Sequence, residues 1–326
     1  MSDAFRAALR QALAISLTAL LVGSFHLPQP FLAVLAAQLI AGFACISGAD
    51  FLKRITAAWA GSMAGLFLLV AAPDQQWISI PAFGVFSGSG IVAVFRRWGS
   101  APAILFAMGI GGMFSAGLVY PGTGLISGSA HAMSLSIAAI SSVLAWTVCM
   151  RQTGTAGTAK ATLSPILIGL AASASLIVAA LTIPAEAVVM TIATMTTIFA
   201  LQTSPGKPGI AARTIGAGVG ILVSVTFLVI VSGSGNNLAI FLAALALVMG
   251  SFEWLAASHP ANGAMFRQAA ALFAVAATML PRPDQFLFGS LDRMLAVVIG
   301  FAVAVAFSVT PSRHTIRAFP GAQAHK

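Results

Sequence analysis

Apolar runs of about 20 residues follow one another along almost the whole chain, and each is long enough to cross the hydrocarbon core of a bilayer as a helix. Only 7% of the 326 residues are charged and 59% are hydrophobic, a balance that excludes an ordinary soluble domain. We therefore predict an all-α membrane protein with about twelve transmembrane helices. The expected spans are residues 9–26, 30–47, 53–72, 77–95, 102–120, 127–149, 164–182, 184–203, 210–232, 236–257, 261–280 and 288–309.

The basic residues indicate how these spans are oriented. When alternate loops are assigned to opposite sides of the membrane, fourteen Lys and Arg residues fall on one side and only Arg282 and Arg293 on the other. Because cytoplasmic loops are rich in Lys and Arg, both termini are expected to be cytoplasmic. Arg6 and Arg10 precede the first run and no small-residue cleavage site follows it, so we expect a retained first helix.

The chain repeats itself at an offset of 159 residues, which aligns residues 54–65 with residues 213–224. Three further landmarks recur in the same order near this offset: a Ser-x-Pro before the fifth span, a proline after it, and a Gly-Ser pair at the start of the sixth. Six spans per repeat is an even number, so both halves should enter the membrane from the same side. The predicted parts are a first repeat at 1–150, a cytoplasmic linker at 151–163, a second repeat at 164–312 and a cytoplasmic tail at 313–326.

Short patterns in both halves accompany this two-half plan. They are the opening from Arg10 to Pro28 with its Leu27-Pro28-Gln29-Pro30-Phe31 turn, the Arg54…Gly61…Gly65 pattern, its echo at Arg213…Gly220, and the Gly-Ser start of each sixth span. With these features the chain resembles the fusaric-acid-resistance and aromatic-acid-exporter family of bacterial membrane proteins. Longer members of that family carry a sizeable cytoplasmic region where this chain has only the short segment 151–163.

The resemblance implies a multi-pass protein of the bacterial inner membrane that exports small, often aromatic, organic acids. A related plant family of malate channels resembles a dimer of one such six-helix half. This second likeness implies a pathway at the interface between the two halves.

Arginine–glycine patterns mark the third span of each half. Small residues at this spacing share a helix face and let helix backbones approach closely, so both spans should pack tightly. An arginine at the cytoplasmic mouth of each span can bind a carboxylate through two hydrogen bonds, while anchoring at the interface is the alternative role. The residues are Arg54, Gly61 and Gly65 in the first half and Arg213, Gly216 and Gly220 in the second.

Arg267 lies about six residues inside the eleventh span, where a charge is costly unless it is paired or faces a cavity. Glu253, late in the tenth span, is the expected partner. Two roles are open for Arg267, namely a structural ion pair and substrate binding. On the outer side, His131 and Asp292 occupy equivalent places after the Gly-Ser pairs and are candidates for proton coupling, with a purely interfacial role as the alternative.

We expect a transporter, with proton-coupled efflux of small aromatic carboxylic acids as the leading hypothesis, because no Walker-type loop for ATP is present. A passive organic-anion channel and an accessory membrane subunit are the alternatives. The chain offers no fixed nucleophile, base and oxyanion donor and no metal-spaced His or Cys, so we expect no enzyme, catalytic residue, metal or cofactor. The expected partners are an organic acid and lipid, without nucleic acid, and a homo-oligomer is left open.

Overall fold

The computed structural model describes residues 2–25, 27, 30–41, 48–71, 75–119, 124–149, 163–203, 207–233, 237–277 and 286–309. Within these ranges the regular structure is helical throughout, with twelve α-helices and two short 3₁₀ turns. The prediction of an all-helical chain is therefore confirmed. Residues 151–162 of the predicted linker, the tail at 313–326 and Cys45 lie outside the described residues.

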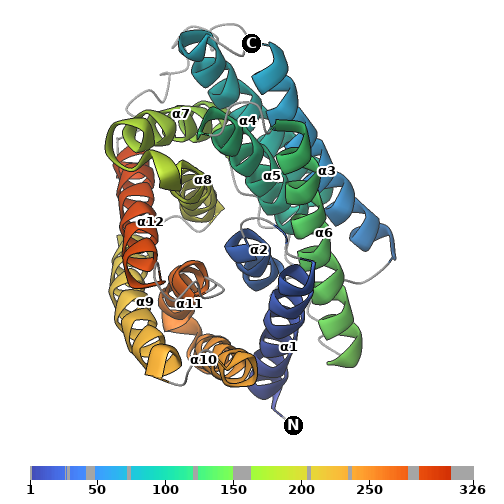
Figure 1. The fold of residues 1–326 in the computed structure, drawn as a ribbon, viewed down its shortest axis with the longest axis vertical. Coiled ribbons are helices and arrows are strands. Elements are labelled where there is room, and N and C mark those ends of the chain that lie inside the picture. Colours follow the sequence, from blue (N-terminus) through green and yellow to red (C-terminus); the bar gives the residue numbers. More distant parts are fainter. Residues whose placement is uncertain are drawn as a thin grey trace, which may run out of the picture.

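Each helix overlaps one predicted apolar run, in the same order (Figure 1). In the described part of the chain, ten segments are long and apolar enough to cross a membrane, which supports a multi-pass membrane protein. The helices are α1 (Asp3–Ser24), α2 (Pro30–Ala41), α3 (Gly48–Ala71), α4 (Gln76–Trp98), α5 (Ser100–Val119), α6 (Gly124–Val148), α7 (Pro165–Thr182), α8 (Ala187–Thr203), α9 (Lys207–Gly233), α10 (Leu238–Ser258), α11 (Gly263–Ala277) and α12 (Phe286–Val309), with the 3₁₀ turns η1 (Pro184–Glu186) and η2 (Pro260–Asn262) before α8 and α11.

Four helices form an inner group, α2, α5, α8 and α11, and the other eight surround them (Figure 1). In the apolar segments of α5 and α8, 89% and 72% of the residues are buried. In those of α7, α10 and α12, the buried share is 39% or less. The surrounding helices expose large apolar side chains such as Leu181, Leu222 and Leu247. These exposed side chains form the surface that suits lipid, and the inner group is shielded from it.

The described parts of two inner helices are shorter than a bilayer span. The 12 residues of α2 and the 15 residues of α11 measure roughly 18 and 22 Å at 1.5 Å per residue, against about 30 Å of hydrocarbon. Side chains from two outer helices hydrogen-bond to the last described residue of α2. Arg10 Nε and Trp146 Nε1 both donate to the Ala41 carbonyl, at 2.9 and 3.1 Å. These bonds satisfy the Ala41 carbonyl, for which hydrocarbon would offer no hydrogen-bond donor.

Glycines allow α3 to lie directly against the backbone of α5. A Cβ added to Gly61 would meet the Phe106 carbonyl oxygen. One turn further along, a Cβ on Gly65 would come within 2.9 Å of the Ile110 carbonyl oxygen. The tight packing expected of the third span is therefore made with the fifth helix of the same half.

The second half repeats this arrangement between α9 and α11. A Cβ on Gly216 would meet the Met265 carbonyl oxygen, and one on Gly220 would come within 2.8 Å of the Ala269 carbonyl oxygen. These carbonyls lie 159 residues after the two carbonyls of α5 that Gly61 and Gly65 approach. The glycines lie only 155 residues after theirs, so Gly61 corresponds in packing to Gly216 and not, as the sequence alignment suggests, to Gly220. The third helix is shifted by about one turn between the halves.

The helix contacts also fall into matched couples when α1–α6 are aligned in order with α7–α12. The pair α3 and α5 matches α9 and α11, and the pair α2 and α6 matches α8 and α12. Between the halves, the pair α1 and α10 matches α7 and α4, and the pair α2 and α11 matches α8 and α5. The inner helices thus carry the central contact between the two halves.

Replacing Gly216 by Ala should destabilise the protein, because the added Cβ would force α9 away from the backbone of α11. We expect a loss of about 1–3 kcal/mol, typical of an overpacked interface. Gly218→Ala is the matched control, since the space around Gly218 in the same helix is open, and it should raise stability by up to about 1 kcal/mol through helix propensity. Thermal unfolding of the detergent-solubilised variants measures both effects, and equal behaviour of the two variants would contradict the packing.

Candidate functional site

A cavity of about 420 Å³ lies among the inner helices. Residues of α2 and α5 line it from the first half of the chain, and residues of α8 and α11 line it from the second. Its polar side chains are Gln38, Ser100, Thr196, Thr197, Thr203, Arg213, Glu253, Arg267 and Gln268. A cavity of this size is large enough for a small organic molecule.

Charged residues gather at one end of the cavity, where α9 and α11 begin and α10 ends. Glu253 Oε1 and Arg267 Nη2 form an ion pair at 3.5 Å, so the expected partnership of these two residues is confirmed. The Glu253 side chain is 8% exposed, whereas that of Arg267 is 59% exposed. The pair therefore joins a buried carboxylate to a guanidinium at the open rim.

Glu253 also interacts electrostatically with Arg10 of α1. The Arg10 side chain is buried, and its guanidinium lies over the Trp146 ring at 4.0 Å from the centroid. Because a buried cation is costly without a nearby anion, Glu253 stabilises Arg10 as well as Arg267. The Glu253 carboxylate therefore lies near two guanidinium groups, while the Arg267 side chain is partly available to solvent.

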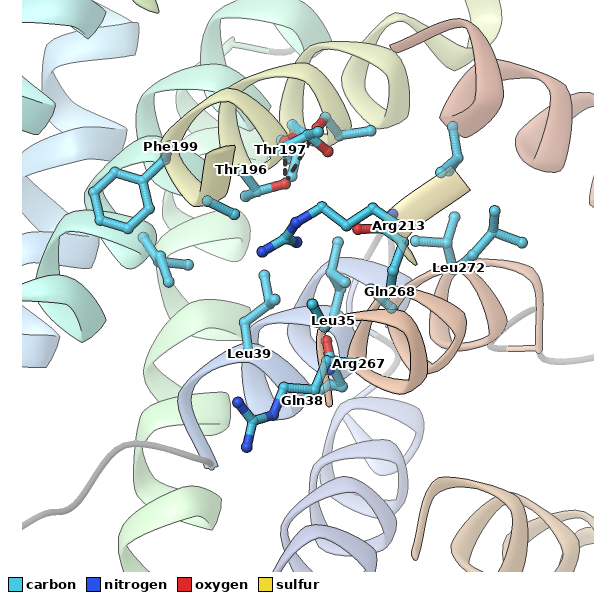
Figure 2. A pocket seen from close by; sticks show the side chains of 18 of the residues that line it. Leu35, Gln38, Leu39, Thr196, Thr197, Phe199, Arg213, Arg267, Gln268 and Leu272 are labelled. Carbon is cyan, nitrogen blue, oxygen red and sulfur yellow. Dashed lines mark hydrogen bonds between the residues drawn. The ribbon is translucent and has the colours of Figure 1, made fainter. Parts of the chain in front are cut away.

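Arg213 extends from α9 into the cavity. Figure 2 shows its guanidinium between Thr196 and Thr197 of α8 on one side and Leu39 of α2 on the other. Arg267 is near enough to repel it electrostatically. No ion pair of Arg213 occurs within the described part of the chain. Its positive charge is therefore directed at the cavity, where it can attract an anion.

The cavity wall becomes apolar away from the arginines. Val189, Ile192, Val275 and Val297 line that part, and each is almost fully buried. Along α8 the cavity extends from Thr203 to Val189, a distance of roughly 21 Å at 1.5 Å per residue. The lining thus suits a molecule with an anionic group at one end and an apolar body.

The structure places the three predicted arginines in different surroundings. Arg213 and Arg267 line the cavity together with Glu253, but Arg54 is not among the lining residues. Arg54 is buried on α3, seven residues before Gly61, whereas Arg213 stands only three residues before Gly216. Since these two glycines are equivalent in packing, Arg54 lies about one turn farther along its helix from the glycine contact than Arg213 does.

The two proton-coupling candidates also lie outside the cavity lining. His131 is buried on α6, where its ring packs against Gly112 of α5 and hydrogen-bonds to the backbone of Met108. Asp292 is exposed near the start of α12. Their equivalent places in sequence therefore do not give them equivalent surroundings.

Several cavity residues were missed by the sequence reasoning. Gln38 and Gln268 are buried amides on the two short inner helices, and Thr196 and Thr197 lie on α8. An amide inside an apolar run is a signal for a polar interior, because lipid-facing positions exclude such groups. The threonines carry no such signal, since their hydroxyls can bond to the preceding turn of the helix.

Glu253 and Arg267 should contribute unequally to stability. Glu253→Gln leaves the buried Arg10 without its nearby carboxylate, so we expect a loss of about 2–4 kcal/mol. Arg267→Gln removes an exposed guanidinium and should cost less than about 1 kcal/mol. Thermal unfolding in detergent measures both, with the double variant expected to match Glu253→Gln alone. Equal losses from the two single variants would indicate a purely structural pair.

No family model, curated protein or solved structure matches this chain.

Proposed function

We propose that the protein is a transmembrane transporter of small organic anions, with the cavity among the inner helices as its binding site. The observation that carries this proposal is the guanidinium of Arg213, directed into a cavity with an apolar far end. Arg213 and Arg267 attract a carboxylate at the rim, and the valine-lined part accommodates an apolar body. This chemistry favours aromatic carboxylic acids, the class implied by the resemblance to the aromatic-acid exporters.

We further propose proton-coupled efflux across a bacterial inner membrane. In the predicted topology the arginine rim faces the cytoplasm, so the cavity would collect its anion from inside the cell. The far end is closed by packed valines. A site open at one end and closed at the other supports a carrier over a continuous pore.

The proposed architecture is a gene duplication with two parallel six-helix repeats. The matched helix couples and the repeated glycine contacts support it. Six helices per half would put both termini in the cytoplasm and relate the halves by an axis along the membrane normal. The cavity would then lie at the interface between the halves.

Removing the charge of Arg213 should impair transport. Loss of a charge-assisted hydrogen bond to a carboxylate costs about 1.5–3 kcal/mol, so Arg213→Gln should reduce efflux at low substrate concentration by roughly 10- to 150-fold. Arg213→Lys should have an intermediate effect because it keeps the charge but loses the planar fork. The measurement is uptake of a labelled aromatic carboxylate into everted vesicles under an imposed proton gradient.

Arg96→Gln is the control for Arg213→Gln, because Arg96 is an exposed arginine at the end of α4 on the same predicted side. Equal losses from the two variants would refute a binding role for Arg213. Flux that persists without a proton gradient, with currents reversing at the equilibrium potential of the anion, would identify a passive channel. Transport in cells but not in vesicles of the purified protein would identify an accessory subunit.

The parallel arrangement predicts that Gln76 and Leu238, at the starts of α4 and α10, face the same side of the membrane. Single cysteines at these two positions, in a background without Cys45 and Cys149, should both react with a membrane-impermeant maleimide added outside intact cells. A cysteine at Ser164, at the start of α7, should react only after permeabilisation. Labelling of Gln76→Cys and Leu238→Cys from opposite sides would contradict the parallel repeat.

A further inference from the structure

A second ion pair lies at the end of the inner group opposite the arginine rim. Glu186, in the turn η1 before α8, and Arg293, on α12, approach to 3.3 Å between Oε2 and Nε. Arg293 Nε also donates to Glu186 Oε1 at 3.4 Å. The side chains are only 13% and 16% exposed, so the pair is largely removed from water.

This pair stands one helical turn beyond the closed end of the cavity. Val189 follows Glu186 by three residues and Val297 follows Arg293 by four, and both valines line the apolar part. In the predicted topology the pair lies on the outer side of the membrane. Because η1 and α12 lead into Val189 and Val297 at the apolar end, an anion leaving the cavity in that direction would pass close to both elements.

We propose that Glu186 is the proton-binding site that locks and releases this outer end, an inference that rests on the proposed transport function. With Glu186 ionised, the pair joins η1 to α12 and keeps the end closed. A proton taken up from the outer compartment neutralises the Glu186 carboxylate and leaves the Arg293 guanidinium charged. Protonation thus removes the charge–charge attraction that joins η1 to α12, so the protonated state favours separation of these two elements.

Few titratable groups surround Glu186 in the described elements that pack against it. The elements packed against η1 are α7, α8 and α12. The segments Pro165–Thr182 and Ala187–Thr203 contain no charged residue. On α12, the charged groups near Glu186 are Arg293 and the exposed Asp292, which repels the Glu186 carboxylate.

The test measures access to a cysteine at Val297, in a background without Cys45 and Cys149. A membrane-impermeant thiol reagent is applied from the outer face of oriented vesicles at several external pH values, and rates are normalised to Gln76→Cys, an exposed reference on the same predicted face. With native Glu186 we expect slow labelling at neutral pH and at least tenfold faster labelling in acid. With Glu186→Gln, labelling should be fast at every pH.

Asp292→Asn is the matched control and should keep the pH dependence. Exchanging the two charges, as Glu186→Arg with Arg293→Glu, should restore slow labelling at neutral pH and so separates loss of the lock from loss of folding. Slow labelling in a folded Glu186→Gln variant, or an acid response that survives it, would overturn the proposal. The labelling assay needs no substrate, so it is independent of the transport measurement. If labelling speeds up in acid but no efflux of any carboxylate is found, the proton site is retained and the transport function is rejected.

Discussion

Hydrocarbon offers no hydrogen-bond partner, and the arrangement of this protein follows from that limit. The cavity contains amides, hydroxyls and guanidinium groups, so it can exist only where other helices exclude lipid. The surrounding helices do this and carry the exposed leucines and phenylalanines. Inside them, Arg10 and Trp146 donate hydrogen bonds to the Ala41 carbonyl of α2, which hydrocarbon could not satisfy.

Close backbone contact at the glycines brings the third and fifth helices of each half together and fixes where their other side chains point. The two halves use the same contact but supply different chemistry. Met108 and Gly109 of α5 occupy the positions that lie 159 residues before Arg267 and Gln268, and neither is charged. The charged rim therefore comes mainly from the second half. The matched helix contacts therefore surround a cavity whose charged residues gather at one end.

The sequence was sufficient for the helices, because each apolar run had to become one in lipid. It also predicted the Glu253–Arg267 pair, since a charge inside a span requires a nearby partner. It could not separate Arg54 from Arg213, because the one-turn shift of α3 relative to α9 depends on contacts with other helices. Nor could it find the pair of Glu186 and Arg293, which are 107 residues apart and meet only because α8 packs on α12.

The burial of α2 and α8 inside the ring has an evolutionary consequence. The side chains of α2 and α8 contact other helices and line the cavity. Selection for an apolar, lipid-facing surface therefore acts on the outer helices and not on these two. A substitution at Gln38 or Thr196 would change the cavity lining and leave the lipid-facing residues of the outer helices unchanged. The shape and polarity of the cavity can therefore change through a few replacements, while the lipid-facing surface stays as it is.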